Sequence, residues 1–378
     1  MSVRAIAFHL PQFHPIPEND EWWGEGFTDW TNVAKAKPRF AGHHQPHEPA
    51  DLGFYDLRMP EARAAQAALA KAYGIYGFCY YHYWFNGRRL LEHPVNEIVE
   101  SGEPDFPFCL CWANENWTRR WDGLESEILM RQEYGPEDDL QHIRSLLPIF
   151  ADRRYIRVEG KPLFLVYRAS LLPEPRKTIR TWRHEAEKAG LKGLYLARVE
   201  CHGERGDPRE IGFDAAVEFP PANHGAPRVY RRRWWHLRRL GTAEAGVREN
   251  YVHSYGEMAE NAMKRREPEY PYYRGVCPGW DNSARRVGEA TIFIDGTPEK
   301  YERWLMEIAK QARNRMGAVE GDAEGPLVFI NAWNEWAEGN HLEPCRRWGR
   351  AYLEATRRAL GTGQESEQRE KAAAAKEA

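Results

Sequence analysis

Two glutamates stand three positions apart in the segment "NAWNEWAEGNHLEP", residues 331–344, directly after the apolar run "PLVFI". Glu335 and Glu338 flank a tryptophan and an alanine. Paired carboxylates beside aromatic side chains suit glycosidic chemistry, in which one carboxylic acid protonates the leaving oxygen and a second carboxylate acts as base or nucleophile. The alternative for Glu338 is a place in the first turn of a following helix, where the helix dipole favours an acid. "EGN" is more typical of a loop.

Glu115, in "CWANENW", is a third candidate carboxylate. Both Glu115 and Glu335 follow an asparagine, whose amide can hold a sugar hydroxyl or orient a carboxylate. The alternative for Glu115 is a structural ion pair with Arg119 or Arg120. The sequence therefore offers three glutamates for two catalytic roles.

The elements that must position these residues are eight short apolar runs that alternate with helical patterns. The runs begin at Val3, Ile75, Phe106, Pro162, Leu194, Phe213, Tyr273 and Pro326. The helical patterns cover residues 60–74, 137–150, 177–190, 257–266, 297–316 and 346–360. Apolar strands followed by helices indicate a parallel sheet covered on its outer face, and eight such strands close a (β/α)₈ barrel.

A doubly wound open sheet is the alternative fold. It would usually carry a glycine-rich phosphate turn after the first strand. Here that strand runs instead into "HLPQFHPIPENDEWWGEGFTDW". We therefore predict an α/β fold, a TIM barrel with long aromatic-rich βα loops. Residues 1–361 would form a single catalytic domain, and 362–378, which lack apolar periodicity, a solvated C-terminal tail.

Polar and aromatic residues gather at one end of the predicted strands. In such barrels catalytic groups lie where strands end and the following loops begin. This placement predicts a set of substrate-binding residues: Tyr81, His82, Trp84, Trp112, Asn114, Glu115, Trp117, Glu200, Trp280, Asp281, Asn334 and Trp336.

The composition excludes several other classes of partner. The net charge of −3 gives no global field for nucleic acid or an anionic membrane, and no stretch is long enough to span a bilayer. The 15 tryptophans supply flat apolar faces with an N–H group, which suits a carbohydrate partner. The six cysteines lack C-x-x-C spacing, and the N-terminus lacks a signal-peptide apolar region, so we expect a cytoplasmic protein. The oligomeric state is not predicted.

Two further clusters are weaker candidates. "HHQPH" (His43, His44, His47) suits a loop wall better than a metal site, because no matching cysteine or histidine set accompanies it. "YRRRWWHLRRL", from Tyr230, suits a solvated helix better than an anion site. Nucleotide-binding and nucleophile-elbow motifs are absent from the sequence. We therefore expect no cofactor and no metal.

Four long segments carry a resemblance to a known family. They are the first loop from Phe8 to Arg58, "YGIYGFCYYHYWFNGRRLLEHP", "CLCWANENWTRRWDG" and "NAWNEWAEGNHLEP". They closely resemble WbsX-like proteins, which are found in bacterial polysaccharide gene clusters and labelled glycosyltransferases. WbsX-like proteins are in turn similar to glycoside hydrolase family 99, endo-α-mannosidases and endo-α-mannanases with a (β/α)₈ barrel.

The resemblance implies a retaining hydrolysis through a 1,2-anhydro sugar. Glu335 falls on the base that deprotonates the sugar 2-hydroxyl, and Glu338 on the general acid/base. This chain has Ala337 where those hydrolases have a histidine. The alternatives are a glycosyltransferase of O-antigen or capsule assembly, and a non-catalytic carbohydrate-binding barrel. Sugar, linkage, and endo or exo action are not predicted.

Overall fold

The computed structural model describes residues 2–119, 124–225, 228, 247, 249–316 and 325–361. Both the predicted C-terminal tail and the segment from Tyr230 lie outside the described residues. Within the described ranges, no helix is long and apolar enough to cross a bilayer. All six cysteines are free and buried.

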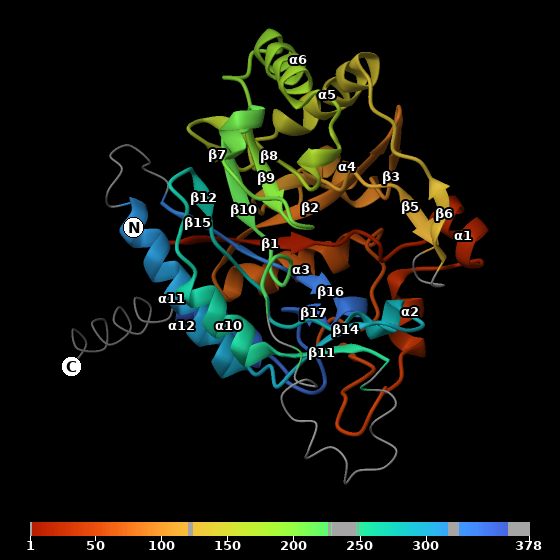
Figure 1. Cartoon of the computed structure of the whole chain (residues 1–378). Helices are drawn as coiled ribbons and strands as arrows, with labels where there is room; N and C mark the ends of the chain where they lie inside the picture. The colour runs from red at the N-terminus through yellow and green to blue at the C-terminus, as the bar shows by residue number, and fades with distance from the viewer. Residues whose placement is uncertain are drawn as a thin grey trace, which may run out of the picture.

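The sheet at the centre is parallel and closes on itself. Its path runs β12-β10-β9-β8-β4-β2-β1-β15-β13. The strands are β1 (Arg4–His9), β2 (Ile75–Phe85), β4 (Phe108–Trp112), β8 (Lys161–Val166), β9 (Tyr195–Glu200), β10 (Ala215–Glu218), β12 (Tyr272–Tyr273), β13 (Gly275–Val276) and β15 (Leu327–Ile330). Only Arg274 separates β12, which pairs with β10, from β13, which pairs with β15. This one segment therefore closes eight strand positions into the predicted TIM barrel. Figure 1 shows the arrangement of the strands and helices.

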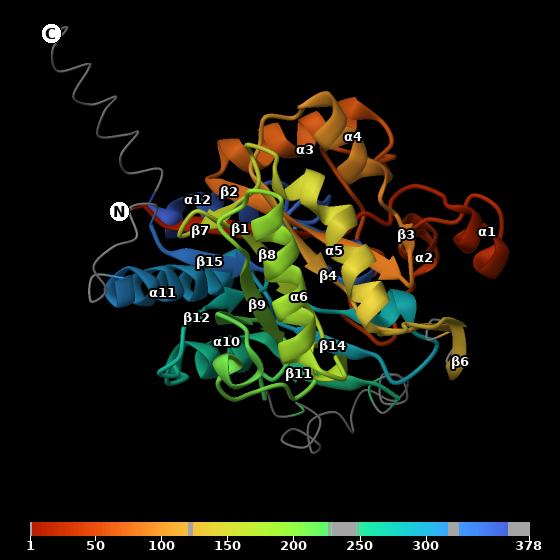
Figure 2. The same ribbon diagram turned by 90° about the horizontal axis from the view of Figure 1, so that it is seen from above.

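Helices surround the barrel, as Figure 2 shows from above. They are α3 (Pro60–Ala72), α4 (His93–Ser101), α5 (Pro136–Phe150), α6 (Pro175–Lys188), α10 (Tyr255–Lys264), α11 (Pro298–Met316) and α12 (Ala351–Leu360). Proline stands near the start of α3, α4, α5 and α6, where a backbone N–H would have no partner within the helix, so its absence costs no hydrogen bond. The six predicted helices are present, although α12 begins later than expected. The nine-residue α4 was not predicted.

After β9 the described chain has only a short 3₁₀ turn, η3 (Pro208–Ile211), in place of a covering helix. The other additions are on the loops that follow strands, except for β7, which lies between α5 and β8. They comprise α1 (Pro17–Trp23) and α2 (Asp29–Lys35), the hairpins β2–β3 (β3, Arg88–Leu90) and β5–β6 (Trp117–Arg119, Leu124–Met130), the short β7 (Arg157–Val158), the pair β11 (Tyr251–Ser254) and β14 (Thr291–Ile294), η2 (Ala169–Leu171) and η4 (Asn282–Arg285). The last loop forms β16 (Asn334–Glu335), η5 (Trp336–Glu338) and β17 (Asn340–His341).

Candidate active site

A cavity of ≈ 580 Å³ lies at the carboxyl ends of the barrel strands. Every one of the eight strand positions contributes to its wall. In strand order the contributors include Leu10, Tyr81, Glu115, Tyr167, His202, Phe219, Trp280 and Glu335. This is the face on which (β/α)₈ enzymes assemble their chemistry.

The two glutamates of the last loop come from opposite ends of one tight turn. Glu335 ends β16, and Glu338 ends the 3₁₀ turn η5. Gly339 follows with a φ of +56°, and a Cβ there would meet the Cβ of Asp281 at 3.0 Å, so this corner requires glycine. The next α-helix begins only at Ala351, so Glu338 belongs to a loop and not to a helix start.

One guanidinium contacts both glutamates. Arg285 Nη2 lies 3.2 Å from Glu335 Oε2, and its Nη1 lies 3.0 Å from Glu338 Oε1. The Arg285 side chain is only 13% exposed, which strengthens each of these charge interactions. A planar guanidinium has the fixed fork of donors that can hold two carboxylates at once. Arg285 therefore sets the mutual position of the two acids.

A third carboxylate holds this arginine from the other side. Asp29, in the first turn of α2, accepts from Arg285 Nε at 3.1 Å and Nη2 at 2.9 Å. The Asp29 side chain is fully buried. Burial acts against the charge on Arg285, but Asp29, Glu338 and Glu335 together raise its pKa well above the ordinary value. The cluster thus joins the first, seventh and eighth loops of the barrel around a permanent cation.

The electrostatics of the cluster favour a proton on the pair of glutamates. Burial raises the pKa of Glu335 from 4.5 to about 8; Arg285 opposes this shift, and Glu338 and Asp29 add to it. Three carboxylates share one cation here, and like charges in a buried site cannot all ionise at neutral pH. Two carboxyls this close titrate as a pair, so their shared proton can lie on either one.

Glu115 lies on another part of the cavity wall. It forms an ion pair with Arg168. Arg119 pairs instead with Glu127 at 2.6 Å, so Arg168 takes the place of the partner expected from the sequence. His202 Nε2 lies 3.9 Å from the same Glu115 oxygen. Glu115 can contact a bound sugar from this wall, with its charge already balanced.

Aromatic rings line the same cavity as the two acids and Glu115. Trp117 packs edge-on against Tyr83 and Trp22, with ring centroids 5.1 and 5.7 Å away. Tyr81, Tyr83 and Trp280 also line the cavity. Flat apolar rings mixed with hydroxyls and an indole N–H suit the faces and edges of a pyranose.

Four of the twelve predicted substrate-binding residues line the cavity: Tyr81, Glu115, Trp117 and Trp280. Asn334 and Trp336 lie behind Glu335. Asn334 Oδ1 accepts from the backbone N–H of Leu10 at 2.7 Å, and Trp336 Nε1 donates to Glu343 at 2.7 Å. These two residues hold the segment that carries the acids.

Glu343, which was not predicted from the sequence, holds Trp336 in place behind the two acids. Its carboxylate accepts hydrogen bonds from Trp336, Gln66 and Tyr55, at 2.7, 2.7 and 2.9 Å. Burial raises its pKa to about 7. Trp336 also stacks on His341, with ring centroids 3.7 Å apart.

His82 and Trp84 point away from the cavity because side chains alternate between the two faces of a strand. In β2, Tyr81 and Tyr83 line the cavity. His82 Nε2 instead lies 2.9 Å from His142 Nε2 of α5, and Trp84 donates to Asp138 of the same helix at 2.8 Å. These two side chains join the barrel to its outer layer.

The same alternation places Trp112 and Asn114 outside the cavity wall. Trp112 packs on His142, with centroids 4.5 Å apart. Asn114 bonds to the backbone of Arg168, donating to its carbonyl at 2.8 Å and accepting from its N–H at 2.7 Å. Asn114 thereby positions the partner of Glu115.

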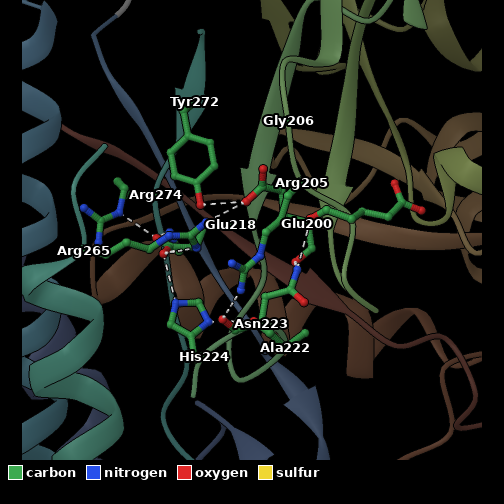
Figure 3. Close-up of polar contacts among 12 residues, drawn as sticks. Glu200, Arg205, Gly206, Glu218, Ala222, Asn223, His224, Arg265, Tyr272 and Arg274 are labelled. Atoms are coloured by element: carbon green, nitrogen blue, oxygen red, sulfur yellow. Dashed lines mark hydrogen bonds and ion pairs between the residues drawn. The ribbon is translucent and has the colours of Figure 1, made fainter. Parts of the chain in front are cut away.

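Glu200 belongs to a buried ion network outside the barrel wall (Figure 3). It contacts Arg265 at 3.1 Å and Tyr270 at 2.9 Å. The neighbouring Glu218 pairs with Arg274 at 2.7 Å. Burial would raise the pKa of Glu218, but His224 and Arg274 lower it to about 2. The two glutamates are thus paired with arginines within the network.

Asp281 positions the loop that carries Arg285. Its carboxylate accepts from His43 and Gln45, each at 2.7 Å, and its backbone N–H donates to the carbonyl of Glu338 at 2.6 Å. His43, from the "HHQPH" segment, thus has a structural partner. Asp281 does not line the active-site cavity.

Comparison with known proteins places the chain in a family. The family model described as Glycosyltransferase WbsX matches residues 5–356. The chain belongs to the WbsX family. WxcX proteins of two Xanthomonas campestris pv. campestris strains are 47% identical over 360 residues, which cover 95% of this chain and 50% of each relative. The chain therefore spans about half the length of these curated relatives.

Solved structures share the fold of this WbsX family member. A glycoside hydrolase-like protein aligns with a TM-score of 0.57 and 13% identity, over 95% of this chain and 94% of that one. The GH99 endo-alpha-mannosidase from Bacteroides thetaiotaomicron aligns with a TM-score of 0.54 and 14% identity, over 97% and 98%. The likeness to these solved structures shows the fold, a barrel that a glycoside hydrolase-like protein and a GH99 endo-alpha-mannosidase share with this chain.

Arg285 and Asp29 were not predicted as site residues. Both stand in segments that were otherwise noted, Asp29 in "FTDW" of the first loop and Arg285 four positions after Asp281. A buried carboxylate pair needs a cation, and that requirement was the signal that could have directed a search for an arginine in these loops.

Proposed function

We propose that the chain is a retaining glycoside hydrolase that cleaves a polysaccharide or oligosaccharide, with Glu335 and Glu338 as its catalytic residues. The observation that supports this most is the contact of both carboxylates with one buried guanidinium, in a cavity lined by tryptophan and tyrosine. Two carboxyl groups held together beside a sugar-sized aromatic cavity are the groups that glycosidic cleavage requires.

In the first step Glu335, as carboxylate, takes the proton of the sugar 2-hydroxyl. The 2-oxygen attacks the anomeric carbon, the glycosidic C–O bond breaks, and Glu338 gives its proton to the leaving oxygen. A 1,2-anhydro sugar results. In the second step Glu338 takes a proton from water, whose oxygen attacks the anomeric carbon. The bond from that carbon to the 2-oxygen breaks, and Glu335 returns the proton to the 2-oxygen.

The reactive form of the pair carries one proton, on Glu338. A hydroxyl that donates to Glu335 favours the ionised form of that carboxyl, so substrate binding shifts the shared proton towards Glu338. Burial raises the pKa of Glu335, so as a base this carboxylate accepts a hydroxyl proton more readily than an ordinary glutamate does. The positive charge of Arg285 offsets part of the negative charge of the three carboxylates during both steps.

The test begins with a screen of pure polysaccharides, resolved by linkage, for release of reducing ends. On an active glycan Glu335→Gln and Glu338→Gln should each lose at least about a thousandfold in turnover while glycan binding persists. Glu115→Gln, from the same cavity but outside the pair, is the matched control and should keep measurable turnover. A dead Glu115→Gln with an active Glu338→Gln would move the acid role to Glu115.

Transfer to a sugar acceptor is the second candidate, and the description of the family favours it. A glycosyltransferase should bind a nucleotide sugar saturably in calorimetry, and a hydrolase should not. A non-catalytic carbohydrate-binding barrel should bind glycan equally well with or without either glutamate, and release no reducing ends.

A further inference from the structure

A second cavity, of ≈ 220 Å³, lies beside the active-site cavity. Trp280 lines both cavities. Asp281 and Gly339 line the second, while their chain neighbours Asn282 and Glu338 line the first. The backbone contact of Asp281 N with Glu338 O, at 2.6 Å, joins the two segments. The two cavities therefore lie on either side of these hydrogen-bonded segments, with Trp280 in the wall of both.

The wall of the second cavity is rich in aromatic rings. Trp280, Phe293, Trp348 and Tyr352 line it, together with His44. The side chains of Trp280, Phe293 and Trp348 are half-buried, so part of each ring is open to a ligand. The volume is below the roughly 300–1,000 Å³ of pockets for drug-sized ligands, so it suits one sugar unit and not a longer chain.

The charges of this cavity leave one cation available. Asp281 is bonded to His43 and Gln45. Asp295 accepts from Lys300 at 2.5 Å and from the backbone of Tyr255 at 2.9 Å. Arg347 is exposed, with its guanidinium carbon 5.1 Å from the Trp348 ring centroid. In the part of the chain that the structure describes, no carboxylate pairs with it.

We propose that the second cavity binds a sugar unit that carries an anionic group. The aromatic rings would pack against the sugar, and Arg347 would pair with its carboxylate or phosphate. A guanidinium on an aromatic edge of a cavity matches a planar carboxylate or a phosphate in geometry as well as in charge. The cavity would thus select an acidic glycan some units away from the bond that is cleaved. The inference rests on the proposed function only in taking a glycan as ligand.

The experiment measures binding without turnover, by calorimetry at low salt, to wild type and to Glu335→Gln. The carboxylate probes are tetragalacturonate and tetraglucuronate, each against its methyl ester. The phosphate probe is glucose 6-phosphate against glucose. At least one anionic probe should bind about tenfold more tightly than its neutral counterpart, and the pair that shows this identifies the anionic group.

Arg347→Gln should remove this preference, and raised salt should weaken it. Arg346→Gln is the matched control, because Arg346 is exposed and adjacent, pairs with Glu48 at 3.3 Å, and does not line the cavity. Equal binding of anionic and neutral probes would overturn the inference, and so would a preference that survives Arg347→Gln. Neither result depends on whether Glu335 and Glu338 hydrolyse anything, so the two proposals fail separately.

Discussion

The guanidinium of Arg285 lies 3.2 Å from the carboxylate of Glu335, although the two residues are 50 positions apart in the chain. The same guanidinium contacts Glu338 at 3.0 Å and Asp29 at 2.9 Å. Three loops of the barrel thus meet at one cation, and removal of Arg285 would leave three buried carboxyl groups without a positive partner.

Replacement of Arg285 should reduce both stability and activity. Arg285→Gln would leave Asp29 and the two glutamates without their cation, which costs roughly 3–5 kcal/mol of the free energy of unfolding. Turnover should fall by at least about a hundredfold, because the two acids lose their fixed spacing. Chemical denaturation and reducing-end assays measure these effects. Arg285→Lys keeps the positive charge but lacks the forked donors of a guanidinium. Its stability and turnover should lie between those of wild type and Arg285→Gln. An unchanged denaturation midpoint in Arg285→Gln would contradict this account of the cluster.

Removal of the charge on Asp29 should shift the pH profile. Asp29 raises the pKa of Glu335, so Asp29→Asn should lower it. The reactive pair carries one proton and loses it above a pH of about 8, so kcat/KM of wild type should fall above that pH. In Asp29→Asn this alkaline limb should begin at lower pH. A limb that does not move would mean that Asp29 has no electrostatic link to the pair.

Stability should also depend on the Glu335 proton. Its folded pKa of about 8 is above the ordinary 4.5, so the folded state binds more protons than the unfolded state between these values. The free energy of unfolding should therefore fall as pH rises through this window. Glu343, at about 7, adds to the same slope.

The buried histidines do not obscure this effect between pH 7 and 9. Burial lowers the pKa of His9 to about 3 and of His47 to about 4, so both are neutral in the folded form above pH 7 and mostly neutral in the unfolded form. Denaturation at pH 7 and pH 9 should show a decrease in wild type and a smaller one in Glu335→Gln. Equal decreases would show that Glu335 does not hold the extra proton.

Ala337 stands where the resembling hydrolases have a histidine. The structure gives its side chain no exposed surface, so an imidazole there would overpack the core. Ala337→His should cost about 1–3 kcal/mol of the free energy of unfolding and should not increase turnover. Ala337→Ser, which is close in size, is the control. A stable and faster Ala337→His would show that the site tolerates the hydrolase residue.

The barrel strands could be predicted because each is a near-continuous apolar run, and the long helices because their apolar periodicity is strong. The nine-residue α4 was not predicted, although Val95 and Ile98, three positions apart, form its buried face. In β2 Tyr81, His82 and Trp84 were assigned to the site, but side-chain alternation sends Tyr81 inwards and His82 and Trp84 outwards. Without the strand register, the sequence does not say which of them faces the cavity.

The glutamate pair was found because its two members are close in the sequence. Their partners could not be found in this way, since Asp29 and Arg285 are 256 positions apart and meet only when the barrel closes. Glu200 was assigned to the site by the rule that site residues lie where strands end, and the structure places it elsewhere. It ends a strand, as a site residue would, but it faces the outer ion network with Arg265.

The most direct test of the central claim is the configuration of the first product. Proton NMR of the anomeric signal, recorded during the first turnovers of wild type on the active glycan, should show the configuration of the substrate. Glu335→Gln should give no product on the same timescale. An inverted first product, or a retained product at an unchanged rate from Glu335→Gln, would contradict the assignment of Glu335 and Glu338.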